Sequence, residues 1–151
     1  MNSYQHSAGI LNRVGALNGL AATVDEFRAG ILDALWDDLR KPKAEADFSE
    51  LTPVINEIKF ALENLKLWAS RQPLIPSGQT LGEYSLLPQP IGKVLVISAW
   101  NFPFQLSLLP VVNALAAGNE VVLKPSEFAP ITAQVIKKIS CLLYTSPSPR
   151  D

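Results

Sequence analysis

Two short apolar runs with one helical stretch between them constrain the fold of this chain most strongly. The run "KVLVIS" at 93–98 does not alternate between apolar and polar residues, which is typical of a strand buried on both faces. The run "EVVLK" at 120–124 predicts a second buried strand. Between them, "FQLSLLPVVNALAAGN" predicts a helix that Gly118 ends, because glycine adopts the left-handed conformation readily. Strand, helix and strand in this order form one βαβ unit of a parallel sheet.

The chain before this unit predicts two helices. Residues 17–40 place apolar side chains at three- and four-residue spacing, which is typical of an amphipathic helix. This helix should end at Lys41–Pro42, because proline cannot continue the hydrogen-bond ladder. A second helix should begin at Thr52–Pro53 with Thr52 as its N-cap, and its apolar stripe runs from Val54 to Trp68.

A connector and a further helix complete the predicted order of elements. Residues 71–92 are rich in proline and glycine and leave room for short edge strands around Thr80–Leu87. After the second strand, "SEFAPITAQVIKKIS" predicts a helix with Pro130 near its start. The expected fold class is α/β, with N-terminal helices followed by the start of a doubly wound parallel sheet. Its segments are 1–70 (helical), 71–92 (connector), 93–140 (first βαβ unit) and 141–151 (tail).

The tail "CLLYTSPSPRD" breaks the pattern that precedes it. Helical periodicity runs to Ile139, and the composition then changes to serine, proline and arginine. One back-translation of this tail matches the end of a widely used transposon-based sequencing adapter, so we expect the natural sequence to end near Ser140. The alternative is a natural disordered terminus. In either case Cys141 is left out of the fold and of the site.

Composition excludes several classes of function. A net charge of −1 with interspersed signs gives no footprint for nucleic acid and no basic stripe for a membrane surface. The most apolar segment, 106–117, is too short to span a bilayer, and no secretory signal precedes the first helix. A single cysteine allows no disulfide framework, so the expected location is a reducing cytoplasm. One cysteine and one histidine also argue against a zinc site.

The first candidate site follows the first strand, where "AWNFPF" at 99–104 replaces the usual glycine-rich phosphate loop. Ligands of open α/β sheets bind beyond the carboxyl ends of the strands. There the carboxamide of Asn101 can donate a hydrogen bond to an oxygen that gains negative charge, with Pro103 fixing the backbone. The alternative, which residue type alone favours, is that Asn101 caps the next helix. Trp100 is equally ambiguous, because a large aromatic residue at a strand end is usually part of the core.

The second candidate site is Lys124 and Glu127, after the second strand. Lys124 precedes Pro125 and should stay extended past the strand end. An ammonium and a carboxylate there can grip vicinal ribose hydroxyls, and the carboxylate of Glu127 would repel a 2′-phosphate, which favours NAD over NADP. The alternatives are a snorkelling lysine and a glutamate that stabilises a helix N-terminus.

The combination "WNFPF" and "KPSE" at this separation resembles the aldehyde dehydrogenase superfamily, specifically its class-3-like branch, over roughly residues 34–139. The resemblance implies the opening of that family's cofactor domain, an aldehyde substrate, NAD or NADP, and a homodimer. By this resemblance, Asn101 would be the oxyanion-hole carboxamide, and Phe102 would border the aldehyde tunnel. The backbone of Ile97 and the indole of Trp100 would line the cofactor cleft. Lys124 and Glu127 would hold the adenosine ribose.

The family mechanism that the resemblance implies needs two more residues. A cysteine thiolate attacks the aldehyde, hydride passes to NAD(P)⁺, and a glutamate activates the water that hydrolyses the thioester. Nothing in this sequence matches that cysteine or glutamate, and Cys141 occupies no family position. We therefore expect these 151 residues alone to be inactive. Two alternatives stay open: an acylating dehydrogenase or acyl-phosphate reductase of the same fold, and a non-catalytic nucleotide-binding subunit.

Overall fold

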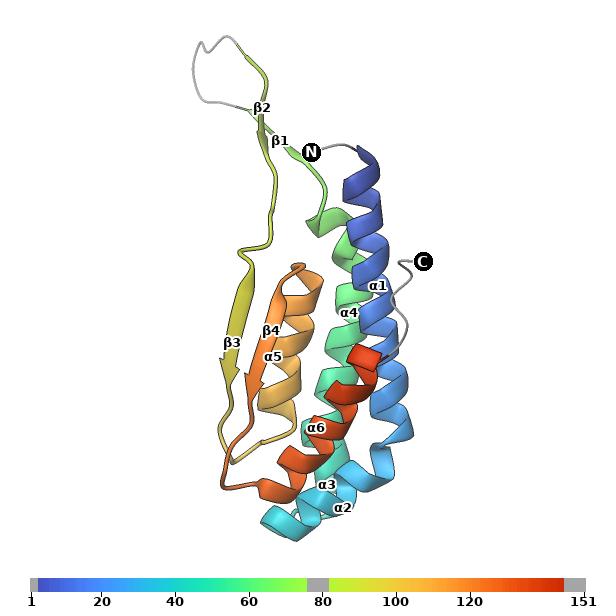
Figure 1. Cartoon of the computed structure of the whole chain (residues 1–151), viewed down its shortest axis with the longest axis vertical. Helices are drawn as coiled ribbons and strands as arrows, with labels where there is room; N and C mark the ends of the chain where they lie inside the picture. The colour runs from blue at the N-terminus through green and yellow to red at the C-terminus, as the bar shows by residue number, and fades with distance from the viewer. Residues whose placement is uncertain (1–2, 76–81, 146–151) are drawn as a thin grey trace.

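The structure, a computed structural model, describes residues 3–75 and 82–145 as a layer of helices beside a small sheet (Figure 1). Helices α1, α2 and α4 form the helical layer, and α5 lies between α4 and the two strands of the sheet. Helix α6 packs on α1 and α2. The helices of this body have the bounds α1 Ser3–Glu26, α2 Arg28–Leu39, α4 Thr52–Trp68, α5 Gln105–Ala116 and α6 Pro130–Thr145.

The predicted βαβ unit is confirmed. Strand β3 (Lys93–Ile97) pairs in parallel with β4 (Glu120–Lys124), in a register that places Lys93 beside Glu120 and Ile97 beside Lys124. Helix α5 connects the two strands and ends before Gly118, whose φ of 86° confirms the predicted left-handed terminator.

The prediction that both strands are buried on both faces is wrong for the described chain. Val96 is buried, but Leu95, Ile97 and Val122 are 61%, 67% and 55% exposed. Helix α5 packs against one face of both strands, and the opposite face is open in the described part of the chain. The apolar residues of β3 and β4 lie on both faces of the sheet, and α5 covers one of these faces.

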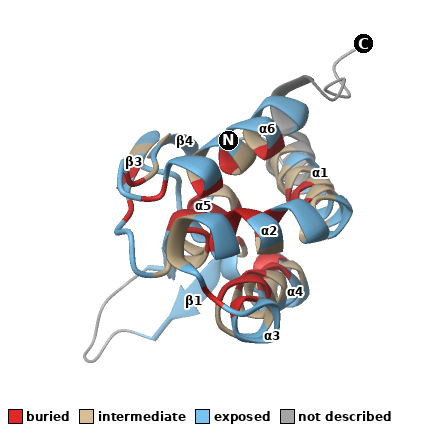
Figure 2. Ribbon diagram, turned by 90° about the horizontal axis from the view of Figure 1, so that it is seen from below, coloured by how far each residue is buried: buried red, intermediate tan, exposed pale blue. Residues whose placement is uncertain are grey.

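The first predicted helix is two helices. Helix α1 begins earlier than expected, at Ser3, and a turn at Phe27 separates it from α2. Helix α2 ends at Leu39, shortly before Pro42, as predicted. The next residue, Arg40, adopts a left-handed conformation with φ 55°. The faces turned toward one another are buried (Figure 2). The buried residues of this core include Leu17, Leu20, Val24, Ile31, Leu35, Val54, Ile58, Ala61, Leu65 and Phe104.

The prediction that Thr52 is an N-cap is wrong. Helix α3 (Lys43–Ala46), the π-helical turn η1 (Asp47–Leu51) and α4 follow one another without a break, and Thr52 itself is helical, with φ −54° and ψ −43°. The Thr52 amide donates a hydrogen bond to the carbonyl of Asp47, five residues earlier in the chain. Because Pro53 has no N–H to donate, a wider turn just before it keeps the helix continuous.

The connector contains a short antiparallel pair of strands that extends away from the helical body (Figure 1). Strand β1 (Gln72–Leu74) pairs with β2 (Tyr84–Leu86), with Pro73 beside Ser85. Strand β2 falls within the predicted edge-strand range, whereas β1 precedes it. The start of that range, Thr80, lies outside the described residues.

Helix α6 begins at Pro130, near the predicted position, but continues past Ile139 to Thr145. The first residues of the tail include no helix breaker, so the helix propagates into them. Cys141 is exposed on this last stretch. Among the described helices, none is long and apolar enough to cross a bilayer.

Candidate functional site

The two candidate segments lie at one edge of the sheet. Strands β3 and β4 are parallel and run in the same direction, so the loops after them emerge at the same end (Figure 1). The Ser98 amide donates to the Lys124 carbonyl at 3.2 Å, which extends the ladder into the first loop. Residues 98–104 and 124–129 are therefore neighbours at the carboxyl edge, as predicted.

Two buried serines anchor the first loop to α5. The Ser107 hydroxyl donates to the Pro103 carbonyl at 2.6 Å, and the Ser98 and Ser107 oxygens lie 2.7 Å apart. A hydroxyl has one proton, so Ser98 is the donor to Ser107. The start of the loop, its end and the first turn of α5 are thus joined by one short chain of hydrogen bonds.

A buried glutamate caps α5. Glu50 Oε2 accepts from the Phe104 amide at 2.8 Å and from the Gln105 amide at 3.3 Å, and the side chain of Glu50 is fully buried. The N-cap residue Phe104 makes no side-chain cap, and Glu50 takes the first two amides, which argues against the interpretation of Asn101 as the helix cap. The sequence analysis missed this role of Glu50, which lies in the turn before α4, four residues ahead of Val54, where the apolar stripe of α4 begins. A carboxylate at that spacing was the available signal.

Lys41 links the same glutamate to the loop. Its ammonium pairs with Glu50 Oε1 and donates to the Asn101 carbonyl at 3.2 Å. The same nitrogen lies 4.1 Å from the centroid of the Phe102 ring, a cation–π distance. Lys41 is 8% exposed. The sequence analysis assigned Lys41 no role except that the first helix should end there.

Asn101 and its neighbours differ in exposure. Asn101 is exposed although its carbonyl is held from inside, and Phe102 is half-buried beneath Lys41. Trp100 is 54% exposed, so its interpretation as a core residue is wrong. The exposed side chain of Ile97 stands beside Lys124 in the sheet register.

Lys124 and Glu127 pair with one another at the end of β4. The Lys124 ammonium donates to Glu127 Oε2 at 2.5 Å, and both side chains are more than half exposed. This hydrogen bond is the main cause that lowers the pKa of the Glu127 carboxyl below its ordinary value. The carboxylate is therefore ionised at neutral pH.

Glu127 does not cap the next helix, because another carboxylate binds the first amides of α6. Asp38 of α2 accepts from the amides of Ile131 and Thr132, at 3.2 and 2.7 Å, through its two carboxylate oxygens. Asp38 thus caps α6 as Glu50 caps α5, and both carboxylates come from the N-terminal helical layer. Lys124 and Glu127 keep donor and acceptor positions that face solvent.

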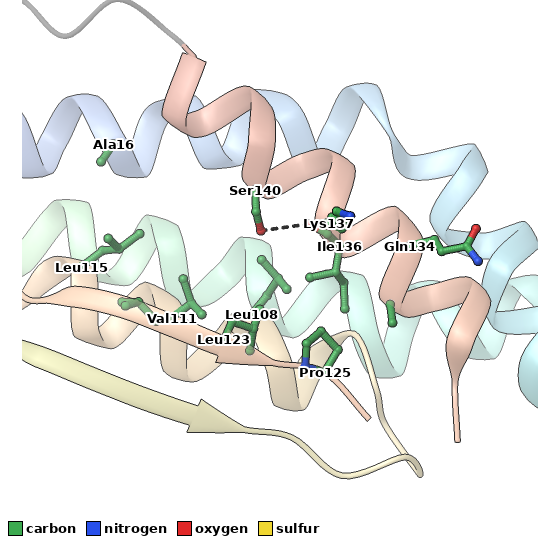
Figure 3. A pocket seen from close by; sticks show the side chains of 12 residues that line it. Ala16, Leu108, Val111, Leu115, Leu123, Pro125, Gln134, Ile136, Lys137 and Ser140 are labelled. Atoms are coloured by element: carbon green, nitrogen blue, oxygen red, sulfur yellow. Dashed lines mark hydrogen bonds between the residues drawn. The ribbon is translucent and has the colours of Figure 1, made fainter. Parts of the chain in front are cut away.

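An apolar cavity of about 640 Å³ lies away from this edge, between α5, β4 and α6 (Figure 3). Its lining includes Leu108, Val111, Leu123 and Ile136. Helix α6 packs on α1 and α2, which leaves this space beside β4. Its lining includes none of the predicted site residues, which stand at an open edge instead of inside an enclosed cavity.

The carboxyl edge carries hydrogen-bonding and aromatic side chains. In the described ranges, no group of three histidine, cysteine or acidic side chains could hold a metal. An ammonium, a carboxylate and an exposed indole beside two parallel strand ends suit sugar hydroxyls and a flat ring. Fold and site together define an α/β protein with a parallel pair of strands, whose first loop carries a carboxamide where nucleotide-binding folds often carry a glycine-rich phosphate loop.

Comparison with known proteins identifies the family. The model of the aldehyde dehydrogenase family matches residues 6–141. A family 3 member I1 aldehyde dehydrogenase, chloroplastic, of Arabidopsis thaliana is 41% identical over 128 residues, which cover 84% of this chain and 23% of that protein. The dimeric NADP-preferring aldehyde dehydrogenase of Mus musculus is 39% identical, over 84% of this chain and 28% of that protein.

A solved structure gives the same result. The substrate-bound AldH of Staphylococcus aureus superimposes with a TM-score of 0.84 and 35% identity, over 86% of this chain and 29% of that one. The chain belongs to the aldehyde dehydrogenase family, and the Arabidopsis relative is named as a member of family 3. It spans about a quarter of the length of the curated relatives that it matches.

Proposed function

We propose that these residues form the N-terminal helices and the opening βαβ unit of an NAD(P)-dependent aldehyde dehydrogenase that oxidises aldehydes to carboxylic acids. The observation that carries this proposal is the loop at 98–104. It is fixed by the buried residues behind it, yet it leaves Asn101 exposed at the carboxyl edge of the sheet. The catalytic cysteine and glutamate of the family mechanism would come from outside this chain.

In this proposal Asn101 stabilises the oxyanion that forms when the thiolate adds to the aldehyde carbonyl. The cap of α5 is Glu50, so the carboxamide of Asn101 is not needed there. Held in advance, such a donor needs no reorganisation when charge develops. Phe102 would border the aldehyde, and its ring is held in place by Lys41.

The second loop would hold the cofactor. Lys124 would donate to and Glu127 would accept from the hydroxyls of the adenosine ribose, while the backbone of Ile97 and the ring of Trp100 line the cleft. When bound, the nicotinamide supplies the acceptor for the hydride that leaves the substrate. Because the carboxylate of Glu127 is ionised, it would repel a 2′-phosphate, which supports NAD as the preferred form. The NADP preference in the name of the mouse relative is the opposing argument.

The proposal extends to partner and location. A homodimer is supported by the dimeric mouse relative. A reducing compartment suits a chain with one cysteine, and we propose the cytoplasm, although the Arabidopsis relative is chloroplastic. The 151 residues alone should form no NADH, because they supply neither of the family's two reacting residues.

The test is the variant Asn101→Ala in the complete enzyme. Loss of one oxyanion donor should lower kcat by about 10²- to 10³-fold, while the Kd of the cofactor stays unchanged. Steady-state NADH formation and cofactor titration measure the two quantities. Equal losses in both would show a structural role for Asn101. A requirement for coenzyme A or phosphate would identify the acylating relative, and a complete protein without turnover would identify the non-catalytic subunit.

A further inference from the structure

A buried ion pair lies directly behind the loop that carries Asn101. Glu50 is fully buried and Lys41 nearly so. Taking two charges out of water is expensive, and a buried pair of this kind often gives no net stability over apolar residues. Besides their bond to one another, Lys41 and Glu50 contact the loop and the start of α5.

Glu50 uses both carboxylate oxygens. Oε1 faces the Lys41 ammonium, and Oε2 accepts from the amides of Phe104 and Gln105. The negative charge sits where the dipole of α5 favours it, and it fixes the residue at which the loop becomes a helix. The end of the loop is thus tied to the helical layer.

Lys41 holds the middle of the loop. Its ammonium donates to the Asn101 carbonyl and lies against the Phe102 ring, at 3.2 and 4.1 Å. The position of Lys41 is in turn set by Glu50. Sixty residues separate Lys41 from Asn101, so this geometry depends on packing between the helical layer and the sheet domain.

We propose that Lys41 and Glu50 are positioning residues that hold the backbone of residues 101–104, and with it the carboxamide of Asn101, in the geometry needed at the reacting carbonyl. This inference rests on the function proposed for Asn101. Both side chains are buried behind the loop, so Lys41 acts through the Asn101 carbonyl, and Glu50 acts through Lys41 and the first amides of α5. A misplacement of about 1 Å in such a constellation can reduce turnover about 100-fold.

The experiment is a double-mutant cycle in the complete enzyme between Glu50→Gln and Asn101→Ala, with kcat and the Kd of the cofactor measured for each variant. We expect Glu50→Gln to lower kcat at least about tenfold, without weakening the cofactor. In the Asn101→Ala background, the same change should lower kcat less than about twofold further, because the group being positioned is gone. The matched control is Asp33→Asn, which breaks the exposed ion pair with Lys43 and should leave kcat unchanged.

A second variant covers the case in which Glu50→Gln fails to fold. Lys41→Met with Glu50→Leu removes both buried charges together, so no charge is left unpaired. It should fold and still show the loss of kcat. Wild-type kcat in this variant, or losses that multiply with Asn101→Ala, would overturn the positioning role while the function proposed for Asn101 stands. Unchanged kcat in Asn101→Ala itself would overturn that function and this inference with it.

Discussion

The two loops at the carboxyl edge of the sheet are held in different ways. The first, 98–104, is tied to buried groups at its start, middle and end, through Ser98, Lys41 and Glu50. The second carries its candidate residues, Lys124 and Glu127, on an exposed ion pair between two nearby side chains. The first loop is fixed by buried groups, whereas the exposed side chains of Lys124 and Glu127 can exchange their partners.

This difference matches the two tasks proposed for the loops. A group that stabilises developing charge must be in place before the reaction, because any rearrangement during the reaction adds to the barrier. Residues that grip the sugar of a cofactor must release it at each turnover, and an exposed pair can open for little free energy. The first loop thus holds its exposed carboxamide through buried contacts, whereas the two side chains of the second loop hold only one another.

The largest effect on stability should come from Lys41→Met. It leaves the charge of Glu50 buried without its partner, which should lower the free energy of unfolding by about 3–5 kcal/mol. Asp33→Asn, at an exposed pair, should change it by less than about 1 kcal/mol. Denaturation of the complete protein measures both variants. Similar values for the two would remove the contrast between the buried and the exposed ion pair.

A smaller effect is expected for Ser107→Ala. It leaves the Ser98 hydroxyl and the Pro103 carbonyl without their partner inside the protein, which should lower the free energy of unfolding by about 1–3 kcal/mol. Faster amide hydrogen exchange in residues 98–104 should accompany the loss. The control is Ser70→Ala, whose hydroxyl bonds the Leu67 carbonyl at an exposed helix end. Unchanged exchange in the loop would show that the serines do not anchor it.

The smallest effect is expected at the second loop. The pKa of Glu127 is lowered in the folded state, so its stabilising contribution is complete above the pKa of the unfolded chain and is lost as the pH falls through the folded pKa. Lys124→Ala should raise this pKa toward the ordinary value and leave the melting temperature unchanged. Carboxyl-carbon NMR titration follows the pKa directly. A pKa that stays low after the substitution would assign the shift to another group.

Local sequence pattern predicted the order of elements well. The parallel pair of strands, the helix between them, its end at Gly118 and the stop before Pro42 all follow from periodicity or from one residue's backbone preference. The break at Phe27 was missed because no glycine or proline marks it. The burial of Leu95 and Val122 was wrong because an apolar run does not say which element covers it.

The candidate site was predictable only in part. Sequence placed Asn101, Lys124 and Glu127 at one sheet edge, because strand ends of a parallel sheet coincide. It missed Lys41 and Glu50, because their bonds to the first loop reach more than fifty residues along the chain. Thr52 and Pro53 also predicted the start of a helix. That prediction left Glu50 before the helix, whereas the helical segment is continuous through it.

The π-helical turn Asp47–Leu51 has a consequence for how this protein tolerates insertions and deletions. Glu50 stands within that turn, and removal of one residue there would restore ordinary helical spacing and rotate the preceding segment by about 100°. If the residue removed is Leu51, which lies between Glu50 and α4, the carboxylate would swing away from the start of α5. In homologous chains, the number of residues just before Pro53 should therefore vary less than the identity of the exposed ones around it.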